Sequence, residues 1–167
     1  MKLSLNRILL PTDFSPASVQ ARNYACSIAG PLDAELHVLH VLSYPHLPSG
    51  PTDSWFVPEE QRVPVVVHDA ELQLEAEMAD SLIKGSRIVK AIRYGEPSHE
   101  ILAYAKEHEI ELIVLGTHGR TGLSHVLIGS VAEKIVQRAE CPVLTVHAEG
   151  LQETADQDCR SNTKCLA

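Results

Sequence analysis

A glycine-rich segment that joins an apolar run to a helical pattern holds the residues best suited to binding an anion. Its first part runs from Gly116 to Arg120 and follows the apolar residues 112–115, and its last part is Gly129 and Ser130, where helical spacing begins. Glycine lets the backbone bend and lets an anion approach the N–H groups closely. The start of a helix adds N–H donors and the positive end of the helix dipole. This spacing predicts a site for the phosphates of a nucleotide.

A second group of ligand-like residues, Pro11, Thr12 and Asp13, follows the apolar run 8–10. Ligands of open parallel sheets bind beyond the carboxyl ends of the strands, where the strand order reverses. If the first and fourth strands are neighbours, a nucleotide fits between these two groups, and Asp13 would bond a ribose hydroxyl or help to hold a metal ion. Asp13 could instead only cap the helix that follows. Ser130 could likewise be an N-cap, although a cap and a phosphate ligand use the same geometry.

Hydrophobic periodicity predicts five strands that alternate with four helices. Such alternation implies right-handed crossovers and a parallel sheet covered on both faces, which is the α/β class, and 167 residues suit a single domain. Prolines interrupt residues 43–64, which we expect to form a long irregular loop, and the polar residues 149–167 should form a flexible tail. The expected strands are 6–11, 35–42, 87–93, 111–115 and 142–147, and the expected helices are 17–29, 65–83, 98–108 and 129–138.

Composition and charge exclude several partners and locations. The formal net charge is −8 and the sequence has no basic run, so we expect no nucleic-acid partner. No apolar stretch is long enough to span a bilayer, so we expect no membrane partner. The polar start of the chain lacks the apolar core of a signal peptide, which makes the cytoplasm the expected location. The four cysteines form no C-x-x-C pair, so a metal or redox motif is not supported.

Signatures of metal binding and of common enzymes are missing from the sequence. His37 and His40 lie three residues apart on a predicted strand, so their side chains should point to opposite faces of the sheet and cannot chelate one ion. The sequence has no Walker A motif and no G-x-S-x-G motif. No residue stands out as a general base for a water at the γ-phosphate. We therefore assign no catalytic residue and expect any ATP turnover to be slow.

Residues 8–15, 116–130 and 141–146 resemble the universal stress protein family, and the similarity extends from Asn6 to about His147. The resemblance implies an open five-stranded parallel sheet in the order 3-2-1-4-5 with helices on both faces, a Rossmann-like fold similar to that of the adenine nucleotide α-hydrolases. The family domain would occupy residues 1–148. Family members that bind ATP carry the glycine pattern, which is complete in this chain, so the resemblance is to the ATP-binding subgroup.

The same resemblance implies a role for each residue that matches the family's motifs. Pro11, Thr12 and Asp13 would line the adenosine pocket, Val41 would contact adenine, and the glycine-rich segment would bind the sugar and the phosphates. Mg²⁺ or Mn²⁺ would be bound through the phosphates rather than by a protein cage. The implied nucleotide-binding residues are Pro11, Thr12, Asp13, Val41, Gly116, Thr117, Gly119, Arg120, Gly129, Ser130 and Val131.

The last predicted strand would leave an edge of unpaired backbone groups. Its residues are apolar or uncharged: Val143, Leu144, Thr145 and Val146. Family members dimerise through this strand, so the resemblance implies a homodimer paired at this edge. The alternative is that the chain's own tail covers the edge.

Together these observations predict a cytoplasmic protein of the universal stress type that binds ATP, ADP or AMP and acts as a dimeric stress-response or regulatory module. One alternative is a slow ATPase or self-phosphorylating enzyme, with Ser130 or Thr121 as the acceptor. Another is a dimeric interaction protein whose pocket stays empty. An unidentified protein partner is compatible with each of the three.

Overall fold

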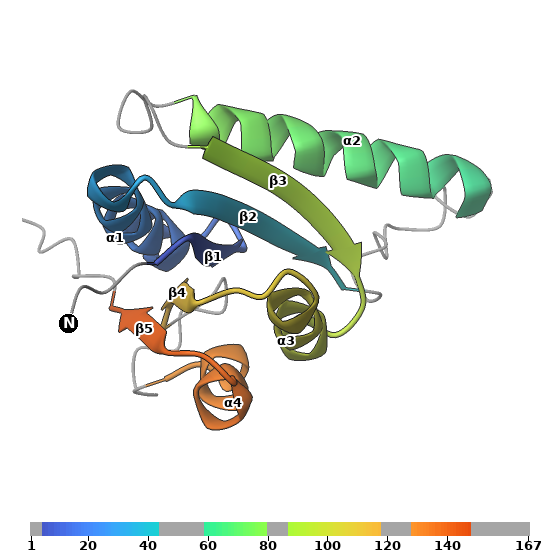
Figure 1. Cartoon of the computed structure of the whole chain (residues 1–167). Helices are drawn as coiled ribbons and strands as arrows, with labels where there is room; N and C mark the ends of the chain where they lie inside the picture. The colour runs from blue at the N-terminus through green and yellow to red at the C-terminus, as the bar shows by residue number, and fades with distance from the viewer. Residues whose placement is uncertain (1–4, 44–58, 80–86, 118–127, 148–167) are drawn as a thin grey trace, which may run out of the picture.

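The computed structural model describes residues 5–43, 59–79, 87–117 and 128–147 of the chain. Within those residues, strands and helices alternate along the chain, which confirms the predicted α/β class (Figure 1). The elements are β1 (Arg7–Thr12), α1 (Pro16–Leu32), β2 (Glu35–Leu42), α2 (Glu59–Met78), β3 (Arg87–Tyr94), α3 (Pro97–Glu107), β4 (Leu112–Gly116), α4 (Ser130–Arg138) and β5 (Val143–Val146).

The five strands form one parallel sheet in the order β3-β2-β1-β4-β5, as expected. The order reverses at β1, because the chain first adds β2 and β3 on one side and then crosses to add β4 and β5 on the other. Ile8 of β1 pairs with Leu112 of β4, and Leu9 pairs with Ile113. The carboxyl ends of β1 and β4 are therefore neighbours. They lie where the strand order reverses, which is where open parallel sheets bind ligands.

Alternating residues of the central strands build two hydrophobic cores, one on each face of the sheet. Ile8 and Leu10 face the core shared with α1 and α2, whereas Leu9 faces the core shared with α3 and α4. In Figure 1 the two pairs of helices lie on opposite sides of the sheet. All three side chains are fully buried, so β1 is the centre of the fold.

The first helix runs slightly past its predicted end. We expected Gly30 and Pro31 to terminate it, but α1 continues through both residues to Leu32. A proline in the last turn removes only one intrahelical N–H, so the helix tolerates it there. The helix ends at Asp33, which adopts a left-handed conformation with φ 52° and donates its N–H to the carbonyls of Ala29 and Gly30.

The second helix differs more from its prediction. It begins at Glu59 and ends at Met78, so the expectation of an irregular loop is wrong for residues 59–64 and the predicted helix end at residue 83 is too late. Glutamate, glutamine and arginine favour helices, and residues 59–62 consist of these types. Residues 44–58 of the expected loop, and the expected tail after residue 148, lie outside the described residues.

The end of β4 packs very closely against the first turn of α1. A Cβ atom added at Gly116 would lie 2.8 Å from the backbone carbon and the Cβ of Ala17, and 2.9 Å from the Ala17 carbonyl oxygen. Protein interiors have no room to absorb such overlaps without moving an element. Helix–strand packing therefore requires glycine at this position, which is a second reason for Gly116 beside the predicted role in phosphate binding.

Replacing Gly116 with alanine should destabilise the protein by about 1–3 kcal/mol, because the added methyl group pushes α1 and β4 apart. Gly30→Ala is a matched control, because a Cβ added at Gly30 has no neighbour within 4 Å. Alanine there should stabilise α1 by up to about 1 kcal/mol. Urea unfolding measures both changes. Equal stability of Gly116→Ala and the wild type would contradict this packing constraint.

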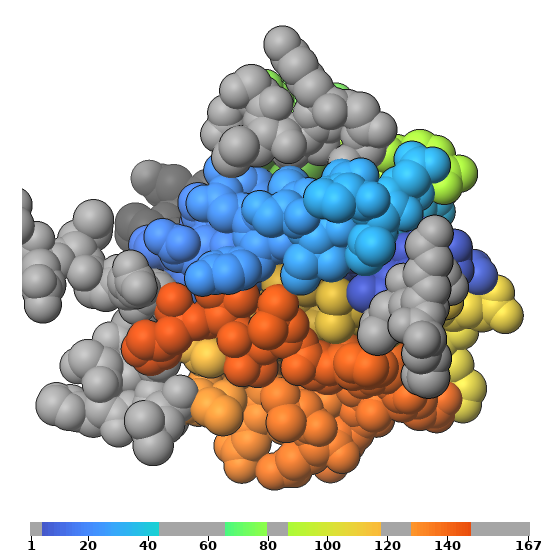
Figure 2. All heavy atoms as spheres, turned by 60° about the vertical axis from the view of Figure 1, so that its left-hand side comes forward, coloured from blue at the N-terminus to red at the C-terminus, as the bar shows by residue number. Residues whose placement is uncertain are grey.

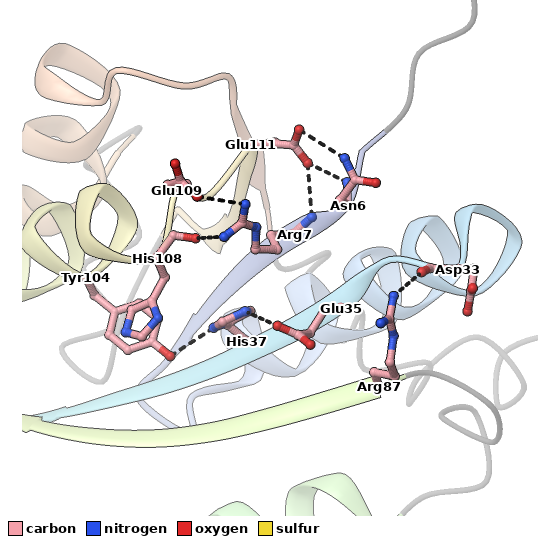
Figure 3. Close-up of polar contacts among 10 residues, drawn as sticks. All are labelled: Asn6, Arg7, Asp33, Glu35, His37, Arg87, Tyr104, His108, Glu109 and Glu111. Carbon is pink, nitrogen blue, oxygen red and sulfur yellow. Dashed lines mark hydrogen bonds and ion pairs between the residues drawn. The ribbon is translucent and has the colours of Figure 1, made fainter.

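A buried polar network lies at the amino ends of the strands (Figure 3). The imidazole of His37, on β2, is buried; its Nε2 lies 2.9 Å from a carboxylate oxygen of Glu35, and its Nδ1 lies 2.9 Å from the hydroxyl of Tyr104 on α3. Because a carboxylate can only accept, Nε2 carries the proton and the tyrosine hydroxyl donates to Nδ1. A neutral imidazole satisfies both partners. Burial lowers the pKa of His37, although Glu35 opposes this shift.

The lowered pKa of His37 predicts that the protein loses stability as the pH falls below 6.5, the ordinary pKa of histidine. In that range the unfolded chain takes up a proton that the buried imidazole resists, and proton uptake by the unfolded state favours unfolding. Urea unfolding between about pH 7.5 and 5.5 should show this slope, and His37→Gln should reduce it. His99→Gln is the control, because the His99 side chain is 76% exposed. An unchanged slope in His37→Gln would refute this origin of the pH dependence.

Candidate functional site

A cavity of about 530 Å³ opens at the carboxyl ends of the central strands. Its walls come from the ends of β1, β2 and β4, from the start of α4 and from residues of α2 and α3. Two members of the predicted set, Gly119 and Arg120, lie outside the described residues. All the other predicted residues line this cavity: Pro11, Thr12, Asp13, Val41, Gly116, Thr117, Gly129, Ser130 and Val131.

Hydrogen bonds within the chain fix the turn that follows β1. The hydroxyl of Thr12, a buried residue, accepts from the N–H of Phe14 at 3.1 Å. One carboxylate oxygen of Asp13 accepts from the N–H of Ser15 at 3.0 Å. Ser15 is the N-cap of α1, and its hydroxyl accepts from the N–H of Ser18. Asp13 therefore braces the turn that precedes the cap rather than capping α1 itself.

A carboxylate from α2 reaches the same turn. The two carboxylate oxygens of Glu77 lie 3.0 and 3.3 Å from the hydroxyl of Thr12. Burial raises the pKa of Glu77 and the charge of Asp13 adds to the shift, whereas the hydrogen bond from Thr12 and the charge of Arg22 oppose it. Sequence reasoning missed Glu77, because no local pattern connects a residue near the end of α2 with a turn 65 residues earlier.

Thr117 joins β4, β5 and α4 directly after Gly116. Its N–H donates to the carbonyl of Val146 at 2.8 Å, and its carbonyl accepts from the N–H of Gly129 at 2.6 Å. Its hydroxyl lies 3.0 Å from Nδ1 of His147, and the residue is buried. These contacts hold the first turn of α4 beside the end of β4, where it meets the cavity.

The first turn of α4 lines the cavity without a side-chain cap among the described residues. Gly129 is the N-cap, in an extended conformation with φ −70° and ψ 154°, and it has no side chain that could accept from the helix N–H groups. The alternative that Ser130 is the N-cap is therefore wrong. The first N–H groups of a helix lack intrahelical acceptors and carry the positive end of its dipole. This end of the cavity is chemically suited to phosphate oxygens.

The part of the cavity at the end of β2 is mainly apolar. Val41 is partly buried there and packs against the core shared with α3 and α4. Leu39 of β2 also lines the cavity. Sequence reasoning missed the apolar residues that α2 and α3 contribute, because only the tertiary structure defines how these helices pack. They are Val66, Ala70, Pro97 and Ile101. An apolar wall of this kind suits a flat heterocyclic base.

The carboxylates that line the cavity come from the turn after β1 and from α2 rather than from α4. Asp13 and the exposed Asp69 of α2 both line it, whereas no lysine or arginine occurs among its described lining residues. The acidic groups disfavour phosphate near β1 and α2, so an anionic ligand would direct its charge to the first turn of α4. Within the described parts of the chain, no group of three or more histidine, cysteine, aspartate or glutamate side chains could hold a metal ion.

The side chains of the two β2 histidines were expected to point to opposite faces of the sheet. His37 packs with Tyr104 of α3, whereas His40 packs with Phe14 in the turn between β1 and α1, so the two imidazoles face opposite sides of the sheet as expected.

None of the helices that the structure describes is long and apolar enough to cross a membrane.

Comparison with known sequences relates the chain to one family throughout its described range. The model of the Universal stress protein family matches residues 4–147. Universal stress protein MJ0531 of Methanocaldococcus jannaschii is 34% identical over 147 residues, which cover 84% of this chain and 81% of that protein. Universal stress protein YxiE of Bacillus subtilis is 36% identical over 146 residues, which cover 84% of this chain and 98% of that protein.

Solved structures share the same fold. That of protein MJ0577 from Methanocaldococcus jannaschii superposes with a TM-score of 0.75 at 26% identity, covering 88% of this chain and 99% of that one. A universal stress protein from Archaeoglobus fulgidus in complex with dAMP has a TM-score of 0.59 at 21% identity, covering 86% of this chain and 99% of that one. The structure of a universal stress protein in complex with cAMP has a TM-score of 0.58 at 22% identity, covering 88% of this chain and 100% of that one. With the match over residues 4–147, the strand order and the position of the cavity, the chain belongs to the universal stress protein family.

Proposed function

We propose that the cavity binds an adenine nucleotide (ATP, ADP or AMP) and that the protein acts as a nucleotide-responsive module of the ATP-binding subgroup. One observation carries this proposal: chain segments around Thr12, Val41, Gly116 and Ser130, which are far apart in the sequence, line one cavity. The cavity's volume of about 530 Å³ lies within the range of ligand-binding cavities. Structures of family members with dAMP and cAMP support an adenylate as the ligand.

The chemistry of the walls orients the ligand. The first turn of α4 would bind the phosphates through its N–H groups. The carboxylate of Asp13 would accept a hydrogen bond from a ribose hydroxyl, and the apolar wall at Val41 would contact the base. Gly119 and Arg120 would complete the phosphate site. Mg²⁺ or Mn²⁺ fits this arrangement only as a companion of the phosphates, because the described residues offer no cage of three ligands.

The site favours binding over turnover. Among the described lining residues, those at the first turn of α4 carry hydroxyl or apolar side chains, and none is a carboxylate or histidine that could activate a water there. Phosphoryl transfer depends on positioned charges and a positioned nucleophile. We therefore propose a cytoplasmic stress-response or regulatory role in which nucleotide occupancy, rather than hydrolysis, is the signal.

The substitution Gly129→Asp tests the phosphate site without relying on loss of the fold. Aspartate is a favourable N-cap, so the variant should keep or raise the melting temperature. Its carboxylate would occupy the N–H groups of α4 and repel phosphate, so affinity for ATP should fall at least about tenfold by calorimetry. Val136→Glu is the charge-matched control, because Val136 is an exposed residue of the same helix, and it should retain affinity. Unchanged ATP affinity in Gly129→Asp would exclude α4 as the phosphate site.

We also propose that two copies pair through β5. The sheet has two outer strands, β3 and β5. β3 carries Arg87, Lys90 and Arg93, and charges of this kind discourage pairing at an edge, whereas Val143–Val146 has none. Figure 2 shows the last described residues, in orange-red, at the molecular surface beside α1 in blue. A surface edge without charged side chains supports a second copy of this chain as its partner.

The backbone pattern of β5 allows a selective test of this pairing. The carbonyls of Pro142 and Val146 accept from β4, so alternation turns the backbone groups of Val143 and Thr145 toward the free edge. Thr145→Pro removes one outward N–H without breaking the ladder to β4 and should convert a dimer to a monomer in analytical ultracentrifugation. Thr145→Val keeps that N–H and should remain dimeric. A monomeric wild type, or a dimeric proline variant, would contradict pairing at β5.

A further inference from the structure

The turn at the end of β1 contains a phenylalanine in an unfavourable backbone conformation. Phe14 has φ 63°, in the left-handed region that bulky residues seldom adopt. Such conformations persist only where the surroundings hold them, and they gather at functional sites. Contacts from outside the turn must therefore hold Phe14 in place.

One buried side chain, His40 of β2, contacts the turn at two points. Its Nδ1 lies 2.8 Å from the carbonyl oxygen of Thr12, and its ring lies 4.5 Å from the ring of Phe14, tilted by 34°. A carbonyl can only accept, so Nδ1 carries the proton and donates it. His40 is 6% exposed and also lines the cavity. It therefore contacts the residue before Asp13 through a hydrogen bond and the residue after it through ring packing.

Asp13 is held between these two contacts. Its carboxylate oxygen Oδ1 accepts from the N–H of Ser15, which fixes the side chain relative to the turn, and the turn itself is fixed relative to β2 by His40. The position of the Asp13 carboxylate in the cavity thus depends on a residue of the neighbouring strand. Binding groups held by such supporting contacts bind more tightly, because less freedom is lost on binding.

We propose that His40 is a positioning residue for nucleoside recognition: it holds the Thr12–Phe14 turn so that Asp13 meets a ribose hydroxyl. This inference rests on the proposed adenine-nucleotide site and adds a specificity determinant to it. The hydrogen bond to the Thr12 carbonyl does the positioning, and the packing of Phe14 on the imidazole stabilises the left-handed backbone that the turn requires.

The ribose hydroxyls give a readout that a purely structural role would not change. Wild-type protein should bind ATP about tenfold more tightly than 2′-deoxy-ATP or 3′-deoxy-ATP, whichever lacks the hydroxyl that Asp13 meets. Asp13→Ala should abolish this preference. His40→Phe, which keeps a ring but loses the donor, should reduce it to less than about twofold, and His40→Asn, whose amide nitrogen can replace Nδ1, should restore most of it. Calorimetric titration of each variant with the three nucleotides measures the ratios.

His37 provides the matched control. It is also a buried histidine of β2, but it bonds to Glu35 and Tyr104 on the other face of the sheet. His37→Asn should lower stability and leave the hydroxyl preference at the wild-type ratio. If His40→Phe does not fold, Phe14→Gly offers a second variant, because glycine adopts φ 63° without strain while losing the ring contact with His40. It should weaken the preference severalfold.

The outcomes separate this inference from the function on which it rests. A wild-type protein that binds no adenine nucleotide would overturn both. Wild-type binding of ATP without any hydroxyl preference, or a full preference in His40→Phe, would overturn the role of His40 while leaving nucleotide binding intact. A full preference in Phe14→Gly would also contradict it. Loss of the preference in His40→Phe with recovery in His40→Asn would support it.

Discussion

The close approach of β4 to α1 at Gly116 controls the geometry of the carboxyl edge of the sheet. A single added carbon atom would overlap Ala17, so β4 can lie where it does only because the side chain is absent. The next residue, Thr117, bonds both Val146 and Gly129. Two consecutive residues thereby set the relative positions of α1, β4, β5 and α4. The first turn of α4 meets the cavity because these contacts bring it there.

The cavity that results has two chemically distinct ends. Near α4 it offers helix N–H groups, and near β1 and α2 it offers the carboxylates of Asp13 and Asp69. Glu77 adds a further carboxylate behind Thr12, and burial raises its pKa. Phosphate groups are attracted by the first end and repelled by the second, whereas ribose hydroxyls can donate to a carboxylate. This difference between the two ends would orient a bound nucleotide, although no described residue of the walls is a lysine or an arginine.

Local patterns predicted the strands, the class and most of the cavity, because apolar runs and glycines mark strand ends and parallel strands bring their carboxyl ends together. Asp13 and Ser130 could be found in this way. The contributions of α2 could not, since Val66 reaches the cavity and Glu77 reaches Thr12 only through the placement of a whole helix, and the start of that helix was itself misjudged. The role of His40 depends on the left-handed backbone of Phe14, for which the sequence has no signal.

Phosphate binding by the first turn of α4 can be tested by following the backbone amides of Ser130, Val131 and Ala132 by ¹H–¹⁵N NMR while ATP, and separately adenosine, is added. If the first turn of α4 binds phosphate, ATP should shift all three amide signals strongly, because each N–H is close to the new charge. Adenosine should shift them far less. If ATP shifts other signals but leaves these three amides unchanged, or if adenosine shifts them equally, the first turn of α4 does not bind the phosphates.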